Sequence, residues 1–191
     1  MEAPFDVLIL CTGNICRSPM AEAVLRERLR ERGIDARVSS AGLSFDDRPA
    51  TPEAVEAAAA LRVDIRQHRS RIMAIEMLER ADLIIAMERL HAREAVVLGE
   101  GLFSRTYTLK ELVRRGEAKG PRGGDERVAE WLERLGAGRR PMELMGRSDD
   151  DDVADPYGRG RPVYDACIGE IDDLVRRAVD LIWPRANEGA A

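Results

Sequence analysis

The segment CTGNICRSP, residues 11–19, follows an apolar run at residues 7–10 and precedes a helical pattern. It therefore predicts a strand, a tight loop and a helix N-terminus in direct succession. The backbone N–H groups of such a loop can surround a tetrahedral oxyanion, and the guanidinium group of Arg17 can bind two of its oxygen atoms. Cys11 would lie at the base of the loop, where the same positive field favours the nucleophilic thiolate. One loop is thus expected to supply both oxyanion binding and a nucleophile.

Simpler interpretations exist for each part of this pattern. A cysteine at the end of a buried strand is often only a small apolar residue, and a Cys–Arg pair at this spacing occurs by chance. The combination of a preceding strand, Gly13 in the loop and Ser18-Pro19 at the helix start favours an oxyanion-binding loop. The other common phosphate loop, GxxxxGK followed by Ser or Thr, is absent from the sequence, which gives a nucleotide triphosphatase little support.

The longer segment CTGNICRSPMAE resembles the active-site loop of low-molecular-weight protein-tyrosine phosphatases, a family with a protein-arginine-phosphatase branch. A second segment, DPYG at residues 155–158, resembles the general-acid loop of that family. The resemblance covers about residues 5–115 and 152–184. It implies a three-layer α/β fold with a four-stranded parallel sheet of order 2-1-3-4 and a site at the carboxyl ends of the strands.

Apolar runs that alternate with helical patterns predict the same class of fold, because alternating strands and helices form a parallel sheet covered on both faces. The expected strands are residues 6–10, 37–40, 83–87 and, more weakly, 106–109. The expected helices are residues 18–32, 51–62, 72–80, a helix that ends near residue 98, and 163–183.

The chain length fits one phosphatase domain, which we assign to residues 1–184, with a flexible tail at 185–191. Residues 116–152 are rich in glycine and charge and are interpreted as an insertion. They contain a possible amphipathic helix at residues 125–135. Two interpretations stay open for this insertion: a loose surface loop, or a lid or docking arm beside Asp155.

The composition of the chain limits the kinds of binding partner that can be expected. A net charge of −5 and a pI near 5.3 do not suggest nucleic-acid binding. No apolar run approaches membrane-spanning length and no signal peptide is present, so we expect a cytoplasmic protein without membrane contact. The three cysteines and two histidines form no metal-ligand pattern, so neither a metal nor another cofactor is expected. The expected partner is a phosphorylated protein substrate, and the expected state is a monomer or weak dimer.

The resemblance implies a role for each residue of the two motifs. Cys11 attacks phosphorus, Arg17 and the loop N–H groups hold the phosphate oxygens, and the Ser18 hydroxyl donates to Cys11. Asp155 protonates the leaving oxygen and then deprotonates water; its simpler interpretation is a turn residue before proline. The implied phosphate-binding residues are Thr12, Gly13, Asn14, Ile15, Cys16, Arg17 and Ser18.

The resemblance also implies supporting residues. Asn14, Ser40 and His68 match positions that brace the loop, although a turn residue, a strand end and a surface residue are their respective alternatives. Tyr157 is expected to form a wall of the pocket and stack on a substrate ring. Cys16 is a candidate for a reversible disulfide with the nucleophile, or else a packing residue.

The substrate class is less constrained than the chemistry. The arginine-phosphatase branch carries threonine at the position of Ile15, and an apolar side chain there suits an aromatic phosphoester. The segments ATPEAVE, ADLIIAM and YTLKE nevertheless resemble the arginine-phosphatase branch. We favour phosphotyrosine as the substrate, because Ile15 lies in the active-site loop whereas the other three segments belong to the scaffold. An arsenate reductase and a non-catalytic phosphate-binding module are weaker alternatives: the former needs further redox cysteines, and the latter would lack Cys11 or Asp155.

Four consecutive aspartates, residues 149–152, precede Asp155. They are expected either to form a negative field that raises the pKa of Asp155 and attracts basic peptides, or to be a solvated loop screened by salt.

Overall fold

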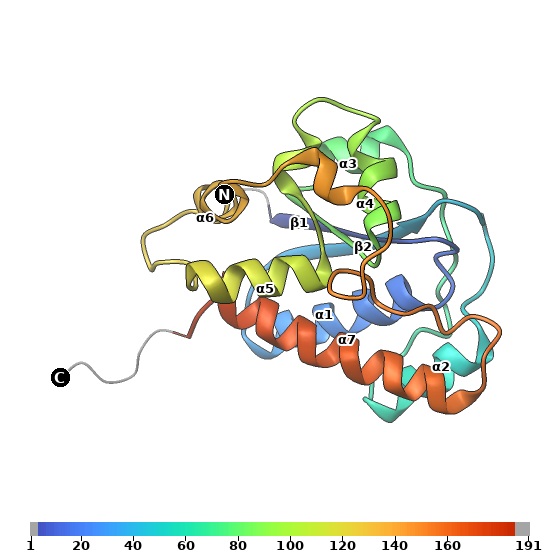
Figure 1. Cartoon of the computed structure of the whole chain (residues 1–191). Helices are drawn as coiled ribbons and strands as arrows, with labels where there is room; N and C mark the ends of the chain where they lie inside the picture. The colour runs from blue at the N-terminus through green and yellow to red at the C-terminus, as the bar shows by residue number, and fades with distance from the viewer. Residues whose placement is uncertain (1–3, 186–191) are drawn as a thin grey trace.

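The computed structural model describes residues 4–185 and contains one four-stranded parallel sheet (Figure 1). Its strands, in the spatial order β2-β1-β3-β4, are β1 (Phe5–Cys11), β2 (Ala36–Gly42), β3 (Leu83–Ala86) and β4 (Thr106–Thr108). This confirms the expected fold class and strand order. The central strand β1 pairs with β2 on one side and β3 on the other, so its carboxyl end lies between two neighbouring strands.

Helices cover both faces of the sheet. They are α1 (Arg17–Glu31), α2 (Pro52–Ala60), α3 (Ile75–Arg80), α4 (Arg89–Val96), α5 (Leu109–Lys119), α6 (Val128–Gly136) and α7 (Arg161–Ile182), with short 3₁₀ helices η1 (Leu102–Arg105) and η2 (Pro141–Leu144). Side chains alternate along β1: Val7 and Ile9 pack toward α1, α5 and α7, whereas Leu8 and Leu10 pack toward α3 and α4. Both faces of the strand are therefore buried, which explains its continuous apolar run.

Two expected features of the helix pattern are wrong. The helix expected from residue 72 begins at Ile75, because Ile72 forms a β-bridge with Gly42, the last residue of β2. Helix α5 has no counterpart in the expected pattern, although its first turn carries a readable signal. The Thr108 hydroxyl accepts a hydrogen bond from the Glu111 N–H, as the cap of a helix does.

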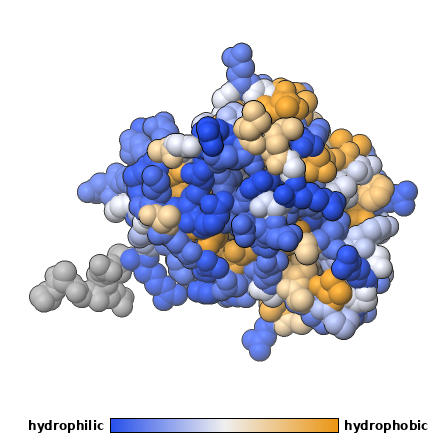
Figure 2. Space-filling model, viewed as in Figure 1, coloured by the Kyte–Doolittle hydropathy of each residue, from blue (hydrophilic) through white to orange (hydrophobic). Residues whose placement is uncertain are grey.

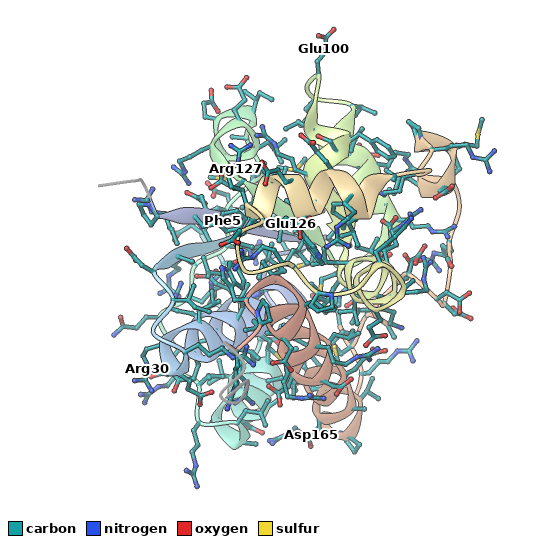
Figure 3. The ribbon with its side chains drawn as sticks, turned by 90° about the vertical axis from the view of Figure 1, so that its left-hand side faces the viewer. Phe5, Arg30, Glu100, Glu126, Arg127 and Asp165 are labelled. Carbon is teal, nitrogen blue, oxygen red and sulfur yellow. The ribbon has the colours of Figure 1, made fainter. Side chains whose placement is uncertain are left out.

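Residues 120–152 are folded against the body of the molecule over much of their length. Trp131 of α6 is fully buried and donates a hydrogen bond through Nε1 to the Gly120 carbonyl, at 3.1 Å. Tyr107 of β4 donates to the Leu132 carbonyl at 3.0 Å. Figure 3 shows α6 near the start of β1, where Phe5 and Val128 line the same groove. A loose surface loop is therefore the wrong interpretation for α6. The domain limits and the insertion itself stay predictions, and the expected tail lies, beyond Arg185, outside the described residues.

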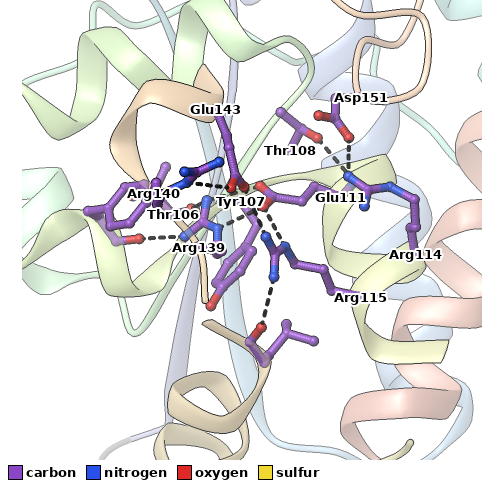
Figure 4. Close-up of polar contacts among 12 residues, drawn as sticks. Thr106, Tyr107, Thr108, Glu111, Arg114, Arg115, Arg139, Arg140, Glu143 and Asp151 are labelled. Carbon is purple, nitrogen blue, oxygen red and sulfur yellow. Dashed lines mark hydrogen bonds and ion pairs between the residues drawn. The ribbon is translucent and has the colours of Figure 1, made fainter. Parts of the chain in front are cut away.

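A buried charge cluster attaches the end of α6 to α5 (Figure 4). The guanidinium group of Arg139 lies over the rings of Tyr107 and Phe103, at 4.0 and 4.3 Å from their centroids. It also donates to the Glu111 carboxylate at 2.7 and 2.9 Å. Arg115 bridges Glu111 to a carboxylate of η2. Because both signs of charge are present and hydrogen-bonded, their attraction and hydrogen bonds offset the desolvation penalty of burying the cluster.

The surface is mostly hydrophilic on the face seen in Figure 2, where hydrophobic residues gather mainly around α3 and α4. Within residues 4–185, none of the helices combines the length and apolar character needed to span a bilayer.

Removing the Trp131 side chain tests how firmly α6 is anchored. Trp131→Ala should lower the free energy of unfolding by about 3–5 kcal/mol, because it leaves a cavity in the core. Met142→Ala in η2 is the matched control, since Met142 is 76% exposed, and it should change stability by less than about 0.5 kcal/mol. Urea unfolding of the three proteins measures both values. Equal stabilities of the two variants would contradict the packing described here.

Candidate active site

The loop that begins at Cys11 connects the end of β1 to the start of α1, at the carboxyl edge of the sheet. Asn14 at its centre adopts a left-handed conformation with a φ of 52°. Asparagine tolerates this conformation better than most residues. The chain can therefore reverse direction within a few residues and turn its N–H groups toward the space above Cys11.

Two donors face the sulfur atom of Cys11. The Ser18 Oγ atom lies 2.9 Å from Cys11 Sγ, and the Asn14 N–H donates to the same sulfur at 3.1 Å. The Ser18 oxygen also accepts a hydrogen bond from Asn14 Nδ2, at 2.9 Å. Because that oxygen is engaged as an acceptor, the Ser18 proton is available to a thiolate at Cys11. The arrangement stabilises negative charge on the sulfur.

Asn14 is the structural centre of the loop. Its Nδ2 group donates to the hydroxyl oxygens of Ser18 and Ser40, the latter at 2.8 Å. Its Oδ1 atom accepts from the Arg71 N–H at 2.9 Å. Its carbonyl oxygen lies 2.7 Å from His68 Nε2, which must therefore carry the proton. Since every polar atom of the buried side chain is engaged, the left-handed conformation is fixed from three directions.

The guanidinium group of Arg17 is buried at the start of α1, with 1% of the residue exposed. Its Nη1 atom donates to the Val153 carbonyl at 2.9 Å and pairs with Glu88, which follows β3. Its Nη2 atom lies 2.8 Å from Asp155 Oδ2. The positive charge is thus oriented by one carboxylate behind it and faces a second carboxylate at the pocket.

A pocket of about 180 Å³ opens above Cys11. The residues that decide its chemistry are Cys11 and Arg17, the side walls Ile15, Phe45 and Tyr157, and the carboxylate of Asp155. Tyr157 is largely exposed, so its ring is accessible to a ligand. The Asp155 Oδ1 atom accepts from the Tyr157 N–H at 3.2 Å, which holds the carboxylate against the turn that follows it. The pocket therefore combines a nucleophile, a cation, a carboxyl group and aromatic walls.

The loop residues named from the sequence, together with Ser40, His68, Tyr157 and Asp155, lie in or directly around this one site. The sequence did not reveal Glu88, His91 or Arg71. Glu88 and His91 follow the carboxyl end of β3, the edge at which sites of such sheets occur, and this position is the signal that could have indicated them. Among residues 4–185, no group of His, Cys, Asp and Glu side chains is arranged to hold a metal ion.

The other two cysteines differ from Cys11 in their surroundings. Burial raises the pKa of Cys16, and its sulfur lies 3.4 Å from the Tyr164 hydroxyl and 3.5 Å from the Thr51 hydroxyl. Burial raises the pKa of Cys167 to about 12. Both groups are therefore thiols near neutral pH, and Cys167 is a core residue of α7.

The acidic run does not form the free negative field considered above. Asp151 is buried and pairs with Arg89 and Arg114, at 2.6 and 2.7 Å. Asp152 accepts from the backbone N–H groups of Arg89 and Ser148, at 2.7 and 3.0 Å. Half of the run is thus neutralised or hydrogen-bonded within the protein. The sequence shows these four charges, but it shows neither the two arginines that compensate Asp151 nor the backbone N–H groups that bind Asp152.

His91 lies beneath the loop and predicts an acid-dependent loss of stability. It is fully buried, its Nε2 atom is 2.9 Å from Thr12 Oγ1, and burial lowers its pKa from 6.5 to about 3. Between these two values the unfolded chain binds a proton that the folded chain does not, so stability falls as the pH falls.

From pH 7 to pH 5, His91 should therefore remove about 2 kcal/mol of stability. Urea unfolding at both pH values measures this loss. Glutamine does not titrate, so between pH 7 and pH 5 the His91→Gln variant should lose about 2 kcal/mol less unfolding free energy than the wild type. The same pH dependence in both proteins would contradict a neutral buried His91.

Comparison with known proteins gives a consistent result. A model of the low molecular weight phosphotyrosine protein phosphatase family matches residues 6–133. A probable low-molecular-weight protein-tyrosine-phosphatase of Ralstonia nicotianae is 43% identical over 180 residues, which cover 94% of each chain. The protein-arginine-phosphatase of Bacillus subtilis is 37% identical over 123 residues, 62% of this chain and 81% of the relative.

A solved structure agrees with both sequence comparisons. The crystal structure of a low-molecular-weight protein tyrosine phosphatase from T. tengcongensis has a TM-score of 0.70 and 30% identity, covering 92% of this chain and 98% of that one. The fold, the loop at Cys11 and these matches together show that the chain belongs to the low-molecular-weight phosphotyrosine protein phosphatase family.

Proposed function

We propose that this chain hydrolyses phosphotyrosine in protein substrates through a cysteinyl-phosphate intermediate. The observation that supports this most directly is the shared pocket of Cys11, Arg17 and Asp155. The sulfur atom of Cys11 is the nucleophile, and two hydrogen-bond donors stabilise its thiolate. The planar guanidinium group of Arg17 can bind two phosphate oxygens. The carboxyl group of Asp155 can donate a proton in the same pocket. An arsenate reductase is less well supported, since Cys167, the only further candidate, lies in the core.

The reaction proceeds in two displacements at phosphorus. The Cys11 sulfur forms an S–P bond while the P–O bond to the leaving group breaks, and the Asp155 carboxyl proton passes to the leaving oxygen. Water then attacks phosphorus, gives one proton to the Asp155 carboxylate and breaks the S–P bond, which returns the thiolate and inorganic phosphate. Arg17 and the loop N–H groups stabilise the equatorial oxygens in both steps.

The contact between Arg17 and Asp155 fits this sequence of events. A bound phosphate that takes the Arg17 fork competes with Asp155 for Nη2, at present 2.8 Å away. The displaced carboxyl group loses its contact with the guanidinium group. It then faces the leaving oxygen as an acid.

The aromatic walls favour phosphotyrosine over phosphoarginine. Phe45 and Tyr157 flank the pocket, where they can pack against a phenyl ring. Ile15 lines the same pocket and brings no hydroxyl to it. Phosphoarginine is the second candidate substrate, because a protein-arginine-phosphatase is among the relatives.

Steady-state kinetics on matched phosphotyrosine and phosphoarginine peptides tests the assignment. The wild type should prefer phosphotyrosine. Ile15→Thr should shift the ratio of kcat/KM toward phosphoarginine about tenfold, or about 1.4 kcal/mol in the barrier. Ile15→Val is the matched control, because valine has the shape of threonine without its hydroxyl, and it should keep the wild-type ratio. A wild type that prefers phosphoarginine would overturn the phosphotyrosine assignment.

Three further assignments stay predictions: a cytoplasmic location, a monomer or weak dimer, and a redox role for Cys16. The last supposes that oxidised Cys11 is captured by Cys16 as a disulfide. Recovery of peroxide-treated Cys16→Ser as complete as that of the wild type would rule it out.

A further inference from the structure

The chain immediately before Asp155 is attached to two helices by a buried carboxylate. Asp151 Oδ2 accepts hydrogen bonds from Arg89 Nε and Nη2, at 2.9 and 2.6 Å. Asp151 Oδ1 accepts from Arg114 Nη2 at 2.7 Å. Arg89 opens α4 and Arg114 lies within α5 (Figure 4 shows the Arg114 contact). We call these three side chains the Asp151 clip.

The clip is difficult to open because its carboxylate is buried. Asp151 is 5% exposed. Burial raises the pKa of Asp151, but the hydrogen bonds from Arg114 and Arg89 outweigh it, and the pKa lies below its ordinary value. The group is therefore ionised near neutral pH, and separating it from the arginines would leave an uncompensated buried charge. The segment is held at this point by a strong local constraint.

The constraint continues from the clip to the catalytic groups. Asp152 accepts from the Arg89 N–H at 2.7 Å. The Val153 N–H donates to the Met87 carbonyl at 2.8 Å, and the Val153 carbonyl accepts from Arg17 Nη1 at 2.9 Å. Each residue from 151 to 153 thus has a fixed partner. Asp155 follows two residues later, with its carboxylate against Arg17 Nη2.

We propose that the Asp151 clip is a positioning device for the general acid, which sets where the Asp155 carboxyl group meets the leaving oxygen. This inference rests on the proposed role of Asp155. Proton transfer requires the two oxygens to approach within about 3 Å, and a displacement of about 1 Å can lower a rate by two orders of magnitude. The clip touches no substrate atom and acts only through the position of the loop.

The leaving-group dependence of kcat/KM distinguishes positioning from general damage. A poor leaving group such as phenol needs the acid, whereas p-nitrophenol departs readily without full protonation. Arg114→Gln is the preferred variant, because 55% of the Arg114 side chain is exposed and folding should tolerate the change. We expect about a tenfold loss of kcat/KM on phenyl phosphate and less than about twofold on p-nitrophenyl phosphate. Arg114→Lys should recover part of the loss.

Two reference variants complete the experiment. Arg177→Gln removes another arginine that ties α5 to a neighbour, through Glu117 at 2.8 Å, and should leave both substrates at wild-type rates. Asp155→Asn should show the same selective loss as Arg114→Gln, but larger. Equal losses on both substrates in Arg114→Gln, or no loss, would overturn the clip alone. If Asp155→Asn does not lose more activity on phenyl phosphate than on p-nitrophenyl phosphate, Asp155 is not the general acid. The proposed role of the Asp151 clip would then be wrong as well.

Discussion

The buried positive charge of Arg17 is the constraint around which the site is organised. A guanidinium group with almost no exposure to water needs compensating partners, and the protein supplies them from segments far apart in the sequence. Glu88 follows β3, while Val153 and Asp155 belong to the segment before α7. The parallel sheet brings Arg17 and Glu88 to one edge, because β1 and β3 both end there. The later segment is attached to the same edge by the Val153 N–H, which donates to the Met87 carbonyl at 2.8 Å. The requirement to neutralise one arginine therefore also brings the carboxyl group of Asp155 to the nucleophile.

The loop itself is stabilised by a second, neutral network. Asn14 connects Ser18, Ser40 and the backbone of Arg71, and these bonds hold the left-handed turn on which the direction of the N–H groups depends. The cost of that conformation for a residue with a side chain is of order 1 kcal/mol, which several buried hydrogen bonds can offset. The ion pairs of Arg17 therefore hold distant segments of the chain together, whereas the neutral hydrogen bonds of Asn14 fix the local backbone of the loop.

Much of this could be predicted from the sequence, for physical reasons. The apolar run before Cys11, the helical pattern that follows the loop and the alternation of strands and helices are local patterns, so they predict the loop and a parallel sheet. The order of the strands came only from the resemblance to the family. Helix α5 was not predicted although Thr108 and Glu111 carry a capping signal, because Gly116 stands at a buried position where an apolar side chain would have continued the helical pattern. The acidic run was misjudged because a sequence shows charges but not their partners: Arg89 and Arg114, far away in the chain, neutralise Asp151. Glu88 and His91 were missed for the same reason, since only the fold brings β3 beside the loop.

The central claim is that Cys11 carries the phosphoryl group during turnover. It is tested most directly by mixing the enzyme with a phosphotyrosine peptide, stopping the reaction within the first turnover and mapping the bound phosphate by mass spectrometry. The account predicts one phosphate on Cys11, no phosphorylated enzyme in Cys11→Ala, and no turnover by that variant. Phosphate on any other residue of the wild type, or substantial turnover by Cys11→Ala, would contradict it.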